Sequence, residues 1–169
     1  NFMKLLMPSH ALKVKEWKED SPIFQKNNIE QQLSSIYADE VFLPSGGSLV
    51  LNQTEALVAI DVNSGSSTKY HNIEETALKT NLEAAEEIAR QLRLRDMAGL
   101  VVIDFIDLAN IKNRKKVYDE IKKHLIKDRA KVSISEFSEY GLLQMTRQRI
   151  GLSLLYSLTH ECKQCKGLG

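Results

Sequence analysis

The sequence has 169 residues, of which 43% are hydrophobic and 27% charged, with three prolines and eight glycines. These values are typical of a soluble globular protein, and the length suits one well-buried domain with a small appendage; a disordered chain and two full-sized domains are both excluded. The formal net charge of +1 neither favours nor excludes a polyanionic partner, so the local distribution of charge must decide.

No stretch approaches the ~18 uninterrupted apolar residues of a membrane span, and the first residues lack the layout of a signal peptide. We therefore expect a cytoplasmic chain. The sequence opens without an initiator Met and stops at Gly169 with no tail. This indicates an excised fragment, and any membrane association would come through parts of the parent protein outside this sequence.

The predicted elements begin with a helix from Asn28 to Ala38, whose apolar residues share one helical face. The period then changes. Short strand-like runs cover residues 41–43, 48–51 and 56–60, and turn residues such as glycine, proline, serine and asparagine separate them.

A long helix is predicted from Ile73 to Arg95, with Asn72 as its N-cap and Glu75 completing a capping box. Residues 100–106 then form a run that is apolar on both faces except for one carboxylate, which is typical of a strand in the middle of a sheet. A helix over 113–127, a strand over 131–135 and an apolar run from residue 141 follow. Strands alternating with helices predict an α/β fold in which helices cover a mixed sheet.

Two carboxylates follow buried strand-like runs, Asp61 after residues 56–60 and Asp104 after residues 100–103. Ligands gather where the strands of an α/β sheet end, and a carboxylate buried there needs a cation, hydrogen-bond donors or a raised pKa. Strand side chains alternate between faces, so Asn63 points the same way as Asp61. Two carboxylates suit a hard cation such as Mg²⁺ or Mn²⁺, which would polarise a phosphodiester and activate the attacking water.

The competing interpretation is that each aspartate caps a helix or forms a turn. Strand alternation places Asp107 on the face opposite Asp104, so it is predicted to be a turn residue or a residue that supports the ligands without binding the cation itself. The small and hydroxyl residues 64–68 are either a phosphate cradle or an ordinary connector, and they lack the spacing of a P-loop. Spacing alone does not name the reaction.

Basic residues gather between positions 110 and 131, where nine Lys and Arg stand against three acidic residues. Such a run could face phosphates, although a basic run on a helix is more often a solvated face.

Cys162 and Cys165 have the two-residue spacing of a zinc knuckle. One knuckle supplies two of four ligands, so the others would come from His160 or from the same knuckle in another chain, which would make a shared Zn²⁺ a dimerisation device. A redox pair is the rival interpretation, but the motif does not open a helix after a strand.

Several motifs occur in unbroken order from about Ser21 to the end, and together they resemble the ribonuclease E/G family. These are Leu43–Ser48, Thr54–Ala56, Ala59–Ser64, Asn81–Ala85, Ala89–Arg95, Val102–Asp107, Gly141–Arg149 and the closing knuckle. The resemblance implies the end of an RNase H-like subdomain over residues 1–36, a DNase I-like catalytic subdomain over 37–158 and a zinc link over 159–169.

The resemblance also implies a role for each candidate residue. Asp61 and Asp104 would bind magnesium, and Asn63 would position the metal-bound groups. Cys162 and Cys165 would be half of a zinc link between protomers, in a tetramer built as a dimer of dimers. An RNA contact would come from Lys131, which stands where the family usually has arginine; the swap keeps the charge but loses the guanidinium fork. Lys112, from the basic run rather than from the resemblance, is the second predicted RNA contact.

The activity that this resemblance implies is magnesium-dependent cleavage inside single-stranded RNA, leaving a 5′-phosphate and a 3′-hydroxyl, in mRNA decay and rRNA processing. The family's S1 subdomain and 5′-monophosphate sensor precede this stretch and are absent, so we do not expect tight substrate binding or 5′-end discrimination from these residues alone. Degradosome proteins would be bound by regions that are also absent.

Two other functions stay open. In the first, the chain is an inactive module for zinc-linked oligomerisation and RNA contact. In the second, it is a general DNase I-like phosphodiesterase that also cleaves single-stranded DNA. A general phosphodiesterase of this kind would be expected to have a catalytic histidine pair. No histidine here has a strand-end context like that of Asp61; the four are His10, His71, His124 and His160.

Overall fold

The computed structural model describes residues 2–65, 73–151 and 162–164. The chain divides into two compact units, Asn1–Ser35 and Ile36–Gly169. The assignment of these parts to RNase H-like, DNase I-like and zinc-link subdomains stays a prediction. No helix in the described ranges is long and apolar enough to cross a membrane.

The first unit consists of short helical segments. They are α1 (Phe2–Leu6), the 3-10 helix η1 (Pro8–Lys13), α2 (Ile23–Lys26) and α3 (Ile29–Ser35). None of these segments holds a buried residue. The predicted helix over residues 28–38 is therefore real but shorter, and it ends before Ile36, which is buried in the second unit.

The second unit is built on a six-stranded sheet with the order β1-β2-β3-β4-β6-β5. The strands are β1 (Glu40–Phe42), β2 (Ser48–Gln53), β3 (Leu57–Asn63), β4 (Gly99–Asp104), β5 (Val132–Ile134) and β6 (Leu142–Arg147). Only β3 and β4 are parallel neighbours; the other pairs of described strands are antiparallel. The mixed α/β fold is confirmed.

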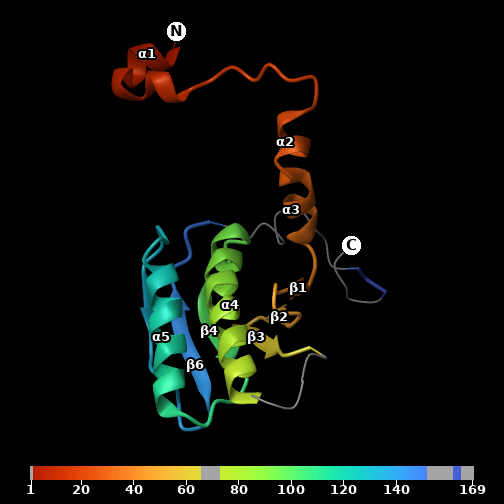
Figure 1. The fold of residues 1–169 in the computed structure, drawn as a ribbon, viewed down its shortest axis with the longest axis vertical. Helices are drawn as coiled ribbons and strands as arrows, with labels where there is room; N and C mark the ends of the chain where they lie inside the picture. The colour runs from red at the N-terminus through yellow and green to blue at the C-terminus, as the bar shows by residue number, and fades with distance from the viewer. Residues whose placement is uncertain (1, 66–72, 152–161, 165–169) are drawn as a thin grey trace. The chain divides into compact units, whose positions relative to one another are not determined.

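Two helices, α4 (Ile73–Leu94) and α5 (Ile111–Leu125), pack side by side against the sheet (Figure 1). The face of α4 that enters the core is rich in alanine, and Ala84, Ala85 and Ala89 are fully buried. These small side chains let the helix approach the strands closely. From the sheet, Leu49, Ile60 and Ile103 complete this core, each no more than 2% exposed.

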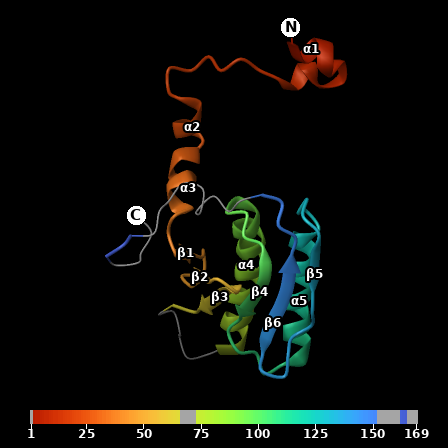
Figure 2. The same ribbon diagram turned by 180° about the vertical axis from the view of Figure 1, so that it is seen from behind.

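The opposite face of the sheet is only partly covered by described residues, which differs from the two-sided burial predicted for residues 100–106. On β4, Val101 and Ile103 are buried, whereas Leu100 is 40% exposed. Gln144 and Thr146 of β6 are exposed on the same side as Leu100. The reason is that both long helices cover one face, as the view from behind makes clear, where β6 lies in front of α5 (Figure 2).

Candidate active site

The two predicted carboxylates lie side by side on the parallel pair of strands. Asp61 of β3 is the direct register partner of Asp104, the last residue of β4. In-register residues on neighbouring strands are about 4.8 Å apart at the backbone and project to the same face. The preceding residues, Ile60 and Ile103, are buried on the face that the helices cover. Because strand side chains alternate, Asp61 and Asp104 project to the opposite, partly open face.

Asn63 belongs to the same site. Its Nδ2 donates to Oδ2 of Asp61 over 3.0 Å, as expected for residues two apart on one strand. The bond fixes the Asp61 carboxylate while the Asn63 side-chain oxygen keeps its capacity to accept. Both residues lie within β3 rather than beyond its end, so the strand ladder holds their backbone.

Both carboxylates are exposed, and the cost of burying them as ions is smaller than the sequence suggested. Partial burial is nevertheless the main cause that raises the pKa of Asp104 above its ordinary value, followed by the negative charges of Asp61 and then Asp107. Like charges this close disfavour each other's ionised form, and a bound cation would offset that repulsion. The electrostatics therefore favour a cation between the strands.

Asp107 lies close enough for its charge to act on Asp104. Alternation applies only while the chain stays in a strand, and β4 ends at Asp104. Asp107 also lies near the turn before β6, where a Cβ on Gly141 would meet its Oδ1 at 3.7 Å. Its negative charge acts on Asp104 together with that of Asp61.

Glycines line the side of the site next to β2. A Cβ on Gly47 would lie 2.5 Å from the backbone oxygen of Asn63 and 2.8 Å from Cγ2 of Thr80. A Cβ on Gly65, whose φ is +63°, would collide with the backbone oxygen of Gly46. Only glycine permits this approach of the turn between β1 and β2 to the end of β3. The remainder of the predicted loop, residues 66–68, lies outside the described residues.

Polar side chains of α4 hold the loops around the site. The carboxylate of Glu83 accepts from the backbone N–H of Ser45 over 2.7 Å. Glu74 accepts from the backbone N–H groups of Ala109 and Asn110 and from Asn113 Nδ2, at 2.9–3.2 Å. These donors, with Asn113 the largest cause, hold the pKa of Glu74 below its ordinary value.

Asn81 makes a third connection from α4. It is fully buried, donates from Nδ2 to the backbone oxygen of Ile106 over 2.8 Å, and accepts the Ile106 N–H on Oδ1 over 3.0 Å. Sequence reasoning gave no role to Asn81, Glu74 or Glu83. A signal did exist for Asn81, because it lies on the helical face of Ala77 and Ala85, and a buried amide must find hydrogen-bond partners.

The two predicted RNA-contact lysines lie at opposite ends of the sheet. Lys112 is exposed in the first turn of α5, which follows the loop after Asp104. Lys131 is exposed beside the end of β6, where its carbonyl accepts from the Gln148 N–H over 2.9 Å. The partner of Asp104 and the partner of Val132 are five positions apart on β6, or about 17 Å.

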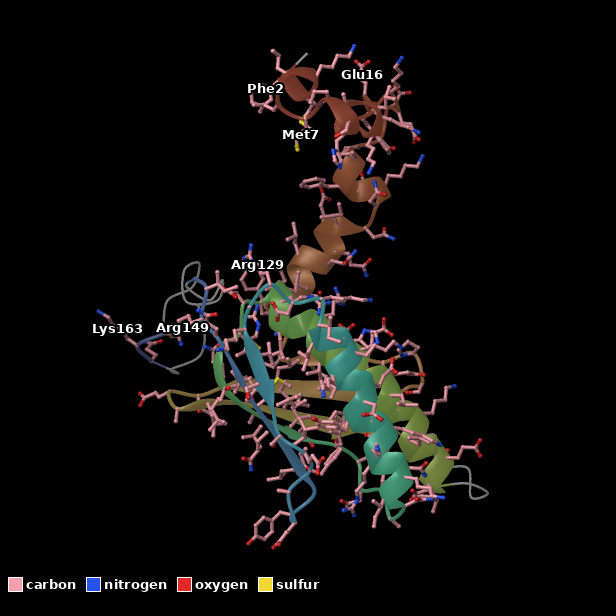
Figure 3. The ribbon with its side chains drawn as sticks, turned by 90° about the vertical axis from the view of Figure 1, so that its left-hand side faces the viewer. Phe2, Met7, Glu16, Arg129, Arg149 and Lys163 are labelled. Atoms are coloured by element: carbon pink, nitrogen blue, oxygen red, sulfur yellow. The ribbon has the colours of Figure 1, made fainter. Side chains whose placement is uncertain are left out.

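The basic run is largely a solvated face. Val117 and Ile121 point into the core, whereas the exposed side of α5 carries lysines; these are Lys112, Lys115, Lys116, Lys122 and Lys123. In Figure 3, which turns α5 toward the viewer, the labelled Arg129 and Arg149 lie at the end of the sheet where Lys131 precedes β5. Local positive charge is therefore found at both ends.

The predicted zinc link is only partly described. Cys162 is half-buried, and Cys165 and His160 lie outside the described residues, as does the predicted N-cap Asn72. Within the described ranges, no group of three or more His, Cys, Asp or Glu side chains is arranged to hold a metal. The zinc ligands therefore stay a prediction from the spacing.

Comparison with known proteins identifies the family. A sequence model described as the Ribonuclease E/G family matches residues 1–150. The chain belongs to the ribonuclease E/G family. The resemblance read from the motifs is thereby confirmed, and the aspartate pair lies within the part that matches this family.

Curated members of the family match nearly the whole chain. Ribonuclease E of Haemophilus influenzae is 52% identical over 167 residues, which cover 99% of this chain and 18% of that protein. Ribonuclease E of Escherichia coli is 49% identical over 162 residues, or 96% and 15% of the two chains. Ribonuclease G of Escherichia coli is 38% identical over 168 residues, or 99% and 34%. The chain thus spans a minor part of the length of these relatives.

Proposed function

We propose that this chain carries the catalytic centre of a magnesium-dependent endoribonuclease that cleaves single-stranded RNA internally. The observation that carries the proposal is the in-register pair of Asp61 and Asp104 on parallel strands, with Asn63 bonded to Asp61. Membership of the ribonuclease E/G family supports RNA as the substrate.

The side chains fit Mg²⁺, with Mn²⁺ as a substitute, better than they fit a softer metal. Mg²⁺ prefers oxygen ligands, keeps several waters and is commonly held by one or two carboxylates together with substrate phosphate. Asp61 and Asp104 provide two carboxylates on an exposed surface where water and phosphate can enter. Neither cysteine nor histidine accompanies them among the described residues, and such ligands would favour zinc.

The reaction is hydrolysis of a phosphodiester. When bound, Mg²⁺ lowers the pKa of a coordinated water and offsets the charge that develops on the phosphate. Oxygen from water forms a bond to phosphorus, the bond from phosphorus to the 3′ oxygen breaks, and that oxygen takes a proton. The products are a 3′-hydroxyl and a 5′-phosphate.

The residues of the chain orient this reaction. Asp61 and Asp104 hold the cation site at the end of two rigid strands. The Asn63 amide keeps Asp61 in one orientation, and its oxygen can accept a hydrogen bond from the attacking water. Fixed positioning of this kind lowers the barrier because the groups need no rearrangement during the reaction.

The decisive experiment is cleavage of a single-stranded oligoribonucleotide by the complete natural protein that carries this chain. Asp104→Asn should reduce kcat at least about 100-fold, since a ligand carboxylate is lost. Asp119→Asn, which changes an exposed aspartate on α5, is the matched control and should cleave normally. Unchanged cleavage by the Asp104 variant would remove the basis for the proposal.

Two further arms separate this function from its rivals. A single-stranded DNA of the same sequence should be cleaved far more slowly, and equal cleavage would favour a general phosphodiesterase. The 169-residue chain should then be assayed by itself, because it covers 18% of the length of a ribonuclease E. We propose that the chain holds the cutting centre and depends on the rest of the protein to bind RNA tightly, which predicts a raised KM for the chain alone.

A further inference from the structure

The segment that follows Asp104 has no strand partner. Residues 105–110 form neither helix nor strand, and the sheet register of β4 stops at Asp104 on both sides. The segment is nevertheless well packed, because Phe105 and Leu108 are 4% and 3% exposed. Its backbone polar groups therefore need partners other than a neighbouring strand.

Asn81 supplies those partners at the position closest to the site. The Ile106 carbonyl accepts from Nδ2 of Asn81 and the Ile106 N–H donates to Oδ1, so a single side-chain amide pairs with both polar groups of one residue. This is the arrangement that another strand would have provided. Ile106, the residue that Asn81 pairs with, lies two residues after Asp104 and one residue before Asp107.

The residue type follows from this geometry. A carboxylate at position 81 would lack the donor, an aliphatic side chain would lack both groups, and glutamine would be one methylene longer. An amide buried without hydrogen bonds costs free energy, and here both halves of the fully buried Asn81 amide are satisfied.

The other contacts of the segment lie farther from Asp104. Arg114 Nε donates to the Leu108 carbonyl over 2.7 Å, and Glu74 accepts from Ala109 and Asn110. Glu74 and Asn81 are seven residues apart and thus share one face of α4. The helix therefore holds both ends of the segment, and Asn81 holds the end next to the carboxylates.

We propose that Asn81 is a positioning residue of the cation site, fixing the backbone after β4 so that Asp104 keeps its place beside Asp61. This inference rests on the proposed function of that site. Side chains that orient metal ligands typically change metal affinity or activity about 10–100-fold when they are removed, and we expect an effect of that size here.

The test compares Asn81→Leu and Asn81→Asp with Gln91→Leu in the complete natural protein. Gln91 is the matched control because it is also a fully buried amide on α4, but its partners Glu87 and Arg95 lie away from the site. Mn²⁺ binding without RNA is measured by electron paramagnetic resonance. Both Asn81 variants should bind Mn²⁺ about 10–100-fold more weakly than the wild type, and Gln91→Leu should bind it within about two-fold.

Kinetics give a second readout. The Asn81 variants should lose kcat and need more Mg²⁺ for half-maximal rate, while KM for RNA changes less than about two-fold, because Asn81 acts on the cation site and not on RNA binding. If Asn81→Leu does not fold, Asn81→Asp carries the test, since it keeps the shape and the acceptor for the Ile106 N–H.

Hydrogen exchange of the wild type tests the contact itself. The Ile106 amide should exchange slowly although it belongs to no strand, and exchange at the rate of an open loop would overturn the inference. Asn81 variants that match Gln91→Leu in both Mn²⁺ affinity and kcat would also overturn it, while Asp104→Asn could still abolish cleavage and leave the proposed function intact. A wild type that neither binds Mn²⁺ nor cleaves RNA would overturn both.

Discussion

Replacing Arg147 with methionine should strongly destabilise the second unit. Arg147 is buried and its guanidinium donates to both oxygens of Asp128, at 2.7 and 3.2 Å, to Asp96 at 2.9 Å and to the Met97 carbonyl at 2.9 Å. These partners come from the turns after α5 and α4, so one side chain on β6 ties two turns of the fold to the sheet.

The size of the effect follows from burial. The side chain of Arg147 is 2% exposed and that of Asp128 is fully buried. Methionine would fill similar space but leave the Asp128 carboxylate without its counter-charge, and removing one member of a buried pair typically costs about 3–5 kcal/mol. The control is Arg90→Met, which breaks a partly exposed pair with Glu87 on α4 and should cost less than about 1 kcal/mol.

The loss should depend on pH. Burial raises the pKa of Asp128, but hydrogen bonds from Arg147 and Ala130 outweigh it and the net pKa lies below its ordinary value. A carboxyl with a lowered folded pKa adds stability that is present above its unfolded pKa and is lost as pH falls through the folded one. Without Arg147 the pKa of Asp128 in the folded state rises, so the free energy of unfolding of the variant falls less on acidification than that of the wild type. The difference between wild type and variant should shrink from pH 7 toward about pH 3.

Urea denaturation followed by far-UV circular dichroism measures these differences. Tryptophan fluorescence is unsuitable, because Trp17 lies in the first unit. The variants should shift the midpoint and leave the slope unchanged, so that the shift reports stability. A loss at pH 7 no larger than that of Arg90→Met, or a difference that grows on acidification, would refute the reasoning.

Three other changes test separate parts of the molecule. Gly47→Ala should cost about 1–3 kcal/mol and lower kcat, because the new Cβ presses on the Asn63 carbonyl; a melting temperature and cleavage rate equal to wild type would contradict this. Lys112→Ala should weaken RNA binding and reduce the slope of log affinity against log salt concentration by about one unit. Lys131→Ala should have a smaller effect, because only Lys112 lies at the aspartate end of the sheet. Equal effects of the two variants would contradict RNA binding at that end alone. Cys165→Ser should remove one Zn²⁺ per two chains and halve the oligomer by light scattering, and a metal-free oligomer of unchanged size would exclude a shared zinc.

The elements around the site could be predicted because their periodicities are strong. The alanine and leucine pattern of α4 and the apolar run of β4 gave nearly the observed bounds, and alternation along β3 put Asn63 beside Asp61, which their hydrogen bond confirms. The family followed from ordered motifs and was confirmed by comparison. The roles of the site residues and both metals stay predictions.

Other features depend on tertiary contacts that local patterns do not encode. Alternation does not fix the direction of Asp107, because β4 ends at Asp104. The partly open face of the sheet was missed because an apolar strand does not reveal on which side the helices pack. The Arg147 network joins residues up to 51 positions apart, and no local pattern indicates such a partner.

The parallel pairing of β3 and β4 has a consequence for the order of folding. Neighbouring parallel strands cannot be joined by a tight turn, and here 43 positions and the whole of α4 separate Asp61 from its partner Asp104. Contacts between such distant positions form late, because the entropy of closing the loop must be overcome first. The two negative charges therefore meet only when α4 has docked on the sheet, and partly folded chains during synthesis should have no site that attracts a divalent cation or cuts RNA.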